Sequence, residues 1–143
     1  MAIKRSKAVE LFWKIHPRLY KLTNGLIGGR IVGMPVLLLT TTGRKSGQPR
    51  ERALTYLPHG DAYVVIASFL GEPRHPDWWL NLQKNPRATV RCSRATVPVV
   101  AREAEGGERE NLWARVVSVN GDYEEYRRRT DRRIPVVVLE PSA

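Results

Sequence analysis

Cationic and hydroxyl side chains gather in one short stretch of this chain, around two glycines four residues apart. Arg44, Lys45 and Ser46 lie between the glycines at positions 43 and 47, and Arg50 follows. Inward-turned backbone amides, hydroxyl groups and guanidinium forks together satisfy the oxygens of a phosphate or a polycarboxylate. The stretch therefore predicts an anion-binding loop. A solvated basic hairpin turn would have the same composition, and the residues alone leave both interpretations open.

The elements on either side of this loop are predicted to be strands. Residues 37–42 form a short apolar run that ends in three threonines, which is typical of a buried strand. Residues 50–57 alternate polar and apolar side chains, as a half-buried strand does. The loop is not a nucleotide P-loop, because Gly43 is followed by Arg44 and Leu38 stands where that motif has its first glycine. Any anion would bind in a strand–loop–strand setting.

Length and composition indicate a single globular domain with a strongly basic N-terminal part. The net charge of the 143 residues is +10; residues 1–50 hold ten Lys or Arg against one acid, and residues 101–143 hold eight against nine. This excess predicts an anionic partner: a phosphate, a polyglutamate, a membrane face or nucleic acid. One cysteine and no signal-like apolar run predict a cytoplasmic protein. Three histidines without ligand spacing predict no metal site.

Residues 8–22 are predicted to form a basic amphipathic helix, within an N-terminal segment of helix and linker that covers residues 1–30. Apolar residues recur in the helix at steps of three and four, and lysines and arginines flank them. The pattern fits a helix that covers the open side of a sheet, which we favour. It also fits a helix that rests on an anionic membrane, which would place the protein peripherally on the inner face of the cell membrane.

Residues 36–141 are predicted to form an α+β fold that is mainly β. Six strands joined mostly by hairpins, with helices outside them, favour an antiparallel barrel or half-open sheet. The predicted helices cover residues 77–84, 109–119 and 121–129. The predicted strands cover residues 37–42, 50–57, 62–68, 88–92, 96–101 and 134–139.

Three separated motifs resemble those of the deazaflavin-dependent nitroreductase (Ddn-like) family of actinobacteria. They are LLTTTGRKSGQPR at residues 38–50, DWWLNL at 77–82 followed by Asn85-Pro86, and TDRRIPVV at 130–137. The resemblance implies a split β-barrel like that of proteins that bind flavin mononucleotide (FMN). It also implies an oxidoreductase that uses reduced coenzyme F-420, a deazaflavin with a phosphate and an oligoglutamate tail. The hydride would go to an electron-poor acceptor such as a quinone or a nitroaromatic compound.

The resemblance further implies which residues contact the cofactor. The phosphate and tail would lie against Arg44, Lys45, Ser46 and Arg50. The ring would lie beside the next two strands, and the helix that begins at residue 77 would close over it. The implied contacts in these elements are Ala53, Leu54, Thr55, Ile66, Ala67, Ser68, Phe69, Asp77, Trp78, Trp79 and Asn81.

Three residues have implied catalytic roles. Ser68 would form a hydrogen bond near the reacting edge of the ring, and Tyr123, with Tyr126 beside it, would stack on the acceptor or give it a proton. Without the resemblance, a hydroxyl bonded to backbone and ordinary core packing of two tyrosines explain the same residues. The chain departs from the family at Phe69, where a lysine is common, and at Asn120, in place of a tyrosine.

Two other functions fit the sequence. An FMN enzyme would use the same barrel, and a basic barrel could bind nucleic acid without catalysis. The aromatic residues cluster at 78–79 and 123–126 and do not alternate with basic strand residues, which argues against nucleic acid. We therefore expect a small-molecule acceptor as the partner, and a monomer or a homodimer.

Overall fold

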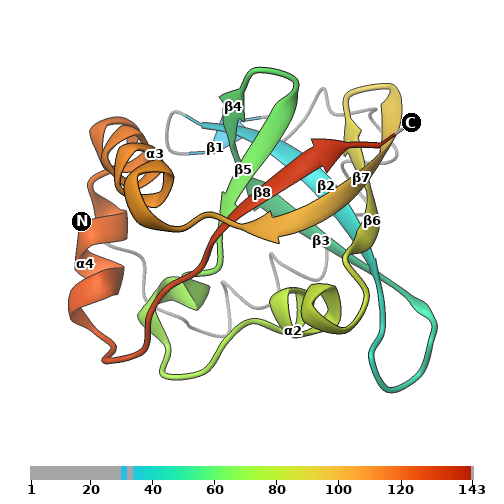
Figure 1. The fold of residues 1–143 in the computed structure, drawn as a ribbon, viewed down its shortest axis with the longest axis horizontal. Helices are drawn as coiled ribbons and strands as arrows, with labels where there is room; N and C mark the ends of the chain where they lie inside the picture. The colour runs from blue at the N-terminus through green and yellow to red at the C-terminus, as the bar shows by residue number, and fades with distance from the viewer. Residues whose placement is uncertain (1–29, 32–33, 143) are drawn as a thin grey trace.

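The computed structural model describes residues 30–31 and 34–142. The predicted basic helix at residues 8–22 lies outside them. Within the described residues, eight antiparallel strands form one curled sheet, accompanied by three α-helices and a 3-10 helix (Figure 1). The strands are β1 (Arg30–Ile31), β2 (Met34–Thr42), β3 (Pro49–Thr55), β4 (Leu57–His59), β5 (Ala62–Ile66), β6 (Arg87–Cys92), β7 (Ala95–Glu103) and β8 (Val136–Pro141). The helices are η1 (Phe69–Gly71), α2 (Asp77–Lys84), α3 (Gly106–Val119) and α4 (Asp122–Arg128).

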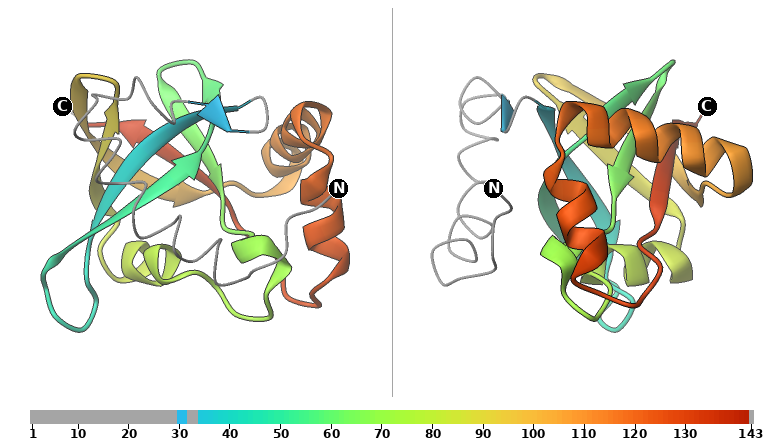
Figure 2. Two further views of the ribbon diagram at one scale, coloured as in Figure 1. Left: turned by 180° about the vertical axis from the view of Figure 1, so that it is seen from behind. Right: turned by 90° about the vertical axis from the view of Figure 1, so that its left-hand side faces the viewer.

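The sheet curls so that its two halves face each other. Its strand order is β1-β2-β6-β7-β8-β5-β4, and β3 pairs with β2. Seen from the front and from behind, β7 and β8 lie on one side of the curl and β2 and β3 on the other (Figures 1 and 2). Helix α2 closes one end of the curl, and α3 and α4 lie together beside it (Figure 1). The predicted mainly β antiparallel fold is confirmed.

Strand β8 is apolar over its first four residues because both of its faces are buried there. Val137 and Leu139 pack inside the curled sheet with β2 and α2, and Val136 and Val138 pack on the other face against α3 and α4. Strands that are buried on both faces have continuous apolar runs, whereas half-exposed strands alternate apolar and polar residues. The sheet therefore separates two cores, one inside the curl and one beneath α3 and α4.

The number of strands differs from the six that the sequence predicted. The predicted strand at 50–57 divides at Tyr56, whose amide donates to the Pro35 carbonyl at 3.0 Å. Before this residue β3 pairs with β2, and after it β4 pairs with β5, so the single predicted strand is two strands with different partners. The two-residue β1 supplies the other additional strand. Helix 77–84 has the predicted bounds, and α3 begins at Gly106, three residues before the predicted start.

Candidate active site

The basic loop, residues 43–48, is a tight connection between β2 and β3. The Gly43 amide donates to the Gln48 carbonyl and the Gly47 amide to the Gly43 carbonyl, both at 2.8 Å. A Cβ on Gly43 would lie 2.7 Å from the Ser46 Oγ, and Gly47 has a φ of +72°. The turn therefore requires glycine at both positions. The predicted strand–loop–strand setting is confirmed.

Helix α2 holds the basic loop through two polar side chains. The Asn81 Oδ1 accepts hydrogen bonds from the Arg44 amide at 3.1 Å and from the Arg44 Nη1 at 3.0 Å, and the Asn81 Nδ2 donates to the Thr41 Oγ1 at 3.1 Å. The Lys84 Nζ donates to the Arg44 carbonyl at 2.9 Å. Asn81 is 3% exposed, so its own hydrogen bonds are largely shielded from competing water, whereas the Lys84 bond is exposed. The position of the loop thus depends on α2.

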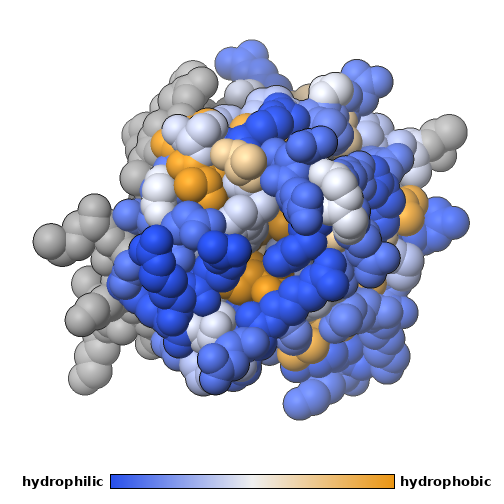
Figure 3. Space-filling model, turned by 60° about the vertical axis from the view of Figure 1, so that its left-hand side comes forward, coloured by the Kyte–Doolittle hydropathy of each residue, from blue (hydrophilic) through white to orange (hydrophobic). Residues whose placement is uncertain are grey.

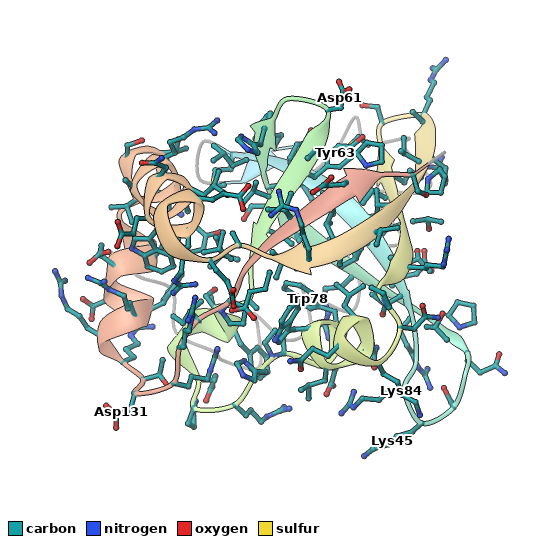
Figure 4. All side chains as sticks on the ribbon, viewed as in Figure 1. Lys45, Asp61, Tyr63, Trp78, Lys84 and Asp131 are labelled. Carbon is teal, nitrogen blue, oxygen red and sulfur yellow. The ribbon has the colours of Figure 1, made fainter. Side chains whose placement is uncertain are left out.

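The cations of the loop and of early β3 differ in how they are paired. The Arg44 Nη2 lies 3.3 Å from the Asp77 Oδ1, and the Arg50 Nη2 donates to the Ser46 Oγ at 3.2 Å. Lys45 is exposed at the tip of the loop, on the same side of the molecule as Lys84 (Figure 4). Arg50 and Lys45 therefore present charge to solvent, and Arg44 shares its charge with a carboxylate.

A pocket of about 570 Å³ opens between the basic loop, the start of β3 and α2. Its walls contain four cationic side chains and two carboxylates, so positive charge is in excess. Trp78, which rises from α2 toward the sheet, supplies its aromatic wall (Figure 4). The lining residues are Thr41, Gly43, Arg44, Lys45, Ser46, Pro49, Arg50, Glu51, Arg52, Asp77, Trp78 and Asn81. Such a pocket suits phosphate or carboxylate groups next to a flat apolar one.

The β5 turn, residues 67–72, is a partly buried corner in an unusual backbone conformation. Phe69, Leu70 and Gly71 have φ values of 45°, 55° and 78°, three successive residues in the left-handed region. A Cβ on Gly71 would lie 2.8 Å from the Tyr126 carbonyl oxygen, so α4 packs directly on the corner. Ser68 is 7% exposed, and its hydroxyl has no hydrogen bond to any described residue. Buried polar groups normally have partners, so a buried hydroxyl without one is a candidate contact for a ligand.

Tyr123 joins α4 to the end of β3. Its hydroxyl lies 2.8 Å from the Thr55 Oγ1, and its ring meets that of Tyr126 edge-to-face with centroids 5.6 Å apart. Burial raises the pKa of Tyr123 to about 12, and the hydrogen bond with Thr55 opposes the shift. The phenol is therefore neutral at physiological pH and keeps a proton that it can donate.

Comparison with known proteins agrees with this geometry. The family described as F420H(2)-dependent quinone reductase matches residues 12–141. This chain belongs to that family. An F420H(2)-dependent quinone reductase of Mycobacterium tuberculosis is 42% identical over 141 residues, which are 96% of this chain and 94% of that protein. The family, the oxidoreductase class, the cofactor F-420 and the quinone type of acceptor are thereby confirmed for this family member.

Solved structures extend the comparison to the fold. One described as an F420-H2 dependent reductase (FDR-A) is 41% identical, with a TM-score of 0.68 over 74% of this chain and 94% of that chain. Another, described as a domain-swapped dimer, is 35% identical, with a TM-score of 0.70 over 94% of this chain and 100% of that one. Structures at 14–16% identity, with TM-scores of 0.53–0.57, share only the fold and confirm the split barrel. Among the described residues, no helix has the length and apolar character needed to cross a membrane.

The predicted site residues of this family member fall into two groups. Those around the pocket are Arg44, Lys45, Ser46, Arg50, Asp77, Trp78 and Asn81. Those on β3, β5, the β5 turn and α4 are Ala53, Leu54, Thr55, Ile66, Ala67, Ser68, Phe69, Tyr123 and Tyr126. Trp79 is buried in the core inside the curl, and Trp78 belongs to the same core and also lines the pocket. Leu54 also packs in that core, whereas Ala53 packs against Val36 and Leu38 on the opposite face of the sheet.

Sequence reasoning missed three residues that border these two groups: Arg52, Lys84 and Arg132. Lys84 could have been found, because positions 77, 81 and 84 are four and three apart and so share one face of α2. Arg52 lines the pocket two residues beyond Arg50, a spacing that puts both on one face of β3. Arg132 belongs to the third motif, but its contact with the turn 64 positions earlier in the chain could not be read from any local pattern.

Proposed function

We propose that this chain binds reduced coenzyme F-420 with its anionic end at the basic loop and its ring along β3 and the β5 turn, and that a quinone accepts the hydride there. The observation that carries the proposal is the cationic pocket, whose loop α2 holds in place through Asn81 and Lys84. The donor set fits the cofactor, because phosphate and glutamate oxygens need guanidinium, ammonium and hydroxyl groups spread along a groove.

The anionic end is assigned to Arg44, Lys45, Ser46 and Arg50. Lys45 and Arg50 are exposed and face no carboxylate in a described ion pair, so an incoming phosphate or carboxylate meets uncompensated charge. The charge of Arg44 is partly neutralised by its ion pair with Asp77. We therefore expect Lys45 and Arg50 to contribute more to affinity than Arg44 does.

The ring is assigned to the surface from Ala53 and Thr55 to the β5 turn. Ser68 supports this assignment because its buried hydroxyl has no protein partner among the described residues. Phe69 stands where the family often has a lysine, and the Arg74 guanidinium lies 4.8 Å from the centroid of its ring. A cation is therefore present beside this position, supplied by another residue.

Reduction of a quinone requires a proton as well as the hydride that the bound cofactor supplies. Tyr123 is the proposed proton donor: its phenol is neutral, and the Thr55 hydroxyl orients it at 2.8 Å. Tyr126, one turn further along α4 and in edge-to-face contact with Tyr123, would support the position of that ring at the acceptor. Asn120, which replaces a family tyrosine, uses its Oδ1 to accept from the Asp122 amide at 3.0 Å and so orders the start of α4.

The oligomeric state and the cellular location of the chain are also proposals. We propose a homodimer or a monomer in the cytoplasm; contact of the basic segment at residues 8–22 with the inner face of the membrane is the alternative to the sheet-covering helix that we favour. A relative that forms a domain-swapped dimer supports the dimer. Light scattering of the full chain would measure the assembly. Pelleting with anionic vesicles, compared with a variant whose Lys4, Lys7 and Lys14 are glutamine, would measure the contact; equal pelleting would exclude it.

The direct test of the anionic site is a titration with oxidised coenzyme F-420, followed by tryptophan fluorescence. Wild type should bind saturably, and Lys45→Ala should bind about tenfold more weakly, because a charged hydrogen-bond partner contributes about 1.5–3 kcal/mol. Arg94→Ala, which removes an equally exposed cation from the β6–β7 turn, should bind as wild type does. Equal weakening by Lys45→Ala and Arg94→Ala would mean that only net charge matters and would reject the site.

A further inference from the structure

We propose that Arg132 is a positioning residue that holds the β5 turn in the shape that presents Ser68 to the cofactor ring; this inference rests on the proposed function. Arg132 belongs to the third sequence motif, and it lies outside both the pocket and the residues assigned to the cofactor. It acts through the turn and does not touch the reacting atoms.

Four N–H groups of the Arg132 guanidinium form hydrogen bonds with one short segment, residues 67–75. Its Nε donates to the Glu72 carbonyl at 3.0 Å, its Nη1 to the Ala67 carbonyl at 3.1 Å, and its Nη2 to the Ser68 carbonyl at 2.7 Å. Its Nη1 also lies 3.1 Å from the His75 Nδ1. A guanidinium has five donors in a rigid planar fork, so one side chain joins both ends of the turn. A lysine at this position could not reproduce that geometry.

The turn needs an external support because of its backbone. Phe69 and Leu70 both have left-handed φ values, which are unfavourable for residues with a Cβ and persist only where their surroundings hold them. Within the turn, the Gly71 amide donates to the Ser68 carbonyl at 2.8 Å and the Glu72 amide to the Phe69 carbonyl at 3.0 Å. The Ser68 carbonyl therefore accepts from both Gly71 and Arg132, which fixes the residue whose hydroxyl is proposed to meet the ring.

The surroundings of Arg132 indicate that its charge stabilises the β5 turn. Arg132 is partly buried, and among the described residues no carboxylate forms an ion pair with it. Its charge is directed at carbonyl oxygens, which strengthens these hydrogen bonds relative to neutral ones. Burial and the adjacent Arg132 lower the pKa of His75, so this ring is neutral at pH 7 and its Nδ1 accepts.

The adjacent Arg133 provides a matched control. Its Nε lies 3.7 Å from the Glu103 Oε2, its side chain is 55% exposed, and none of its described contacts is with the β5 turn. Replacement of either arginine by methionine removes one positive charge, and the two replaced residues are neighbours in the sequence. Arg132→Met should therefore loosen the turn, and Arg133→Met should not.

The experiment compares wild type with Arg132→Met, Arg132→Lys and Arg133→Met in two measurements. The first is hydrogen–deuterium exchange without cofactor, read at the Gly71 and Glu72 amides. The second is stopped-flow oxidation of reduced F-420 by menadione, a soluble quinone, with the cofactor affinity measured in parallel. In Arg132→Met we expect exchange at these amides about tenfold faster, with the sheet amides unchanged. We also expect the saturated rate to fall about 10- to 100-fold while the cofactor Kd changes less than about threefold.

Arg132→Lys, which keeps the charge and is the variant to measure if the methionine variant does not fold, should show the same two changes in smaller degree. Slow exchange of the turn in Arg132→Met and Arg132→Lys, a normal rate, or uniform acceleration of exchange over the whole sheet would overturn the proposal. Absence of F-420 oxidation in wild type is a separate outcome: it would reject the proposed function and, with it, the role of Arg132 in the reaction.

Discussion

The basic loop and the β5 turn both contain residues assigned to the cofactor, and they are built in opposite ways. The basic loop is mostly exposed, and α2 holds it from outside through Asn81 and Lys84 while Lys45 faces solvent. The β5 turn is partly buried; a cation from outside the turn, Arg132, holds its carbonyls, and the Ser68 hydroxyl is left without a described partner.

This difference indicates a division of tasks. Exposed cations attract and retain an anion by charge. Salt screens this attraction, and the attraction tolerates small displacements of the anion. A buried hydroxyl on a fixed turn acts by geometry, and geometry controls the rate of a transfer between two bound molecules. The basic loop should therefore determine how tightly the cofactor binds, and the β5 turn with Tyr123 should determine how fast it reacts.

The largest effect is expected from Tyr123→Phe. Loss of the phenolic proton should lower the turnover of menadione about 100-fold, the lower end of the range for a general acid, while the F-420 Kd stays within about threefold of wild type. Tyr63→Phe is the control, because Tyr63 packs against Tyr56 at a ring-centroid distance of 5.4 Å, on a strand that carries none of the pocket residues. Equal turnover in wild type and Tyr123→Phe would remove Tyr123 from the mechanism.

Asn81→Ala should affect the basic loop and leave the β5 turn unchanged. The substitution leaves the Arg44 amide and the Thr41 hydroxyl without their buried partner, so the free energy of unfolding should fall by about 2 kcal/mol. The F-420 Kd should rise about tenfold, and the saturated rate should remain normal. Urea unfolding and cofactor titration measure these quantities, with Gln83→Ala on the exposed side of α2 as the control. A reduced saturated rate would show that the two regions are not independent.

Arg50→Ala should weaken cofactor binding with no change in stability. Arg50 is exposed, so its loss should raise the F-420 Kd about tenfold and reduce the salt dependence of binding. Titrations at low and high ionic strength, with Arg94→Ala in parallel, measure both effects. If Arg50→Ala and wild type depend on salt to the same degree, the cofactor does not use this charge.

The smallest effect concerns pH and tests the β5 turn. Burial and Arg132 hold the pKa of His75 below its ordinary value of about 6.5, so below that pH the unfolded chain takes up a proton more readily than the folded one. Stability should therefore decline as pH falls from about 6.5 toward the lower folded pKa. Urea unfolding at pH 7.5 and 5.5 should show a larger decrease in wild type than in His75→Gln. Equal decreases in the free energy of unfolding would mean that His75 does not contribute to the pH dependence of stability.

Much of the fold could be predicted because its elements have strong local patterns. The helix at 77–84 follows Pro76 and precedes Asn85-Pro86, and the structure has the same bounds. The break at Tyr56 could not be seen, because a strand that changes its pairing partner keeps the same alternation of side chains. The 3-10 turn at Phe69–Gly71 was also missed, because a left-handed Phe and Leu are imposed by contacts from Arg132 and α4.

The site was predictable in composition and only partly in arrangement. The cations of the basic loop lie within seven residues, so the sequence alone brought them together. The contacts that hold them, between Arg44 and Asn81, span 37 positions, and those between Arg132 and Ser68 span 64. Such contacts follow from the packing of α2 and of the segment after α4, which no local pattern specifies.

The most direct test of the division between binding and reaction is a single-turnover stopped-flow measurement with reduced F-420 and menadione on Arg50→Ala and Ser68→Ala. At increasing cofactor concentration, the predicted result is that Arg50→Ala needs about tenfold more cofactor and reaches the wild-type rate. Ser68→Ala should saturate at the wild-type concentration with a rate about tenfold lower. If both variants change the same parameter, or if Ser68→Ala changes neither, the separation of the two regions is contradicted.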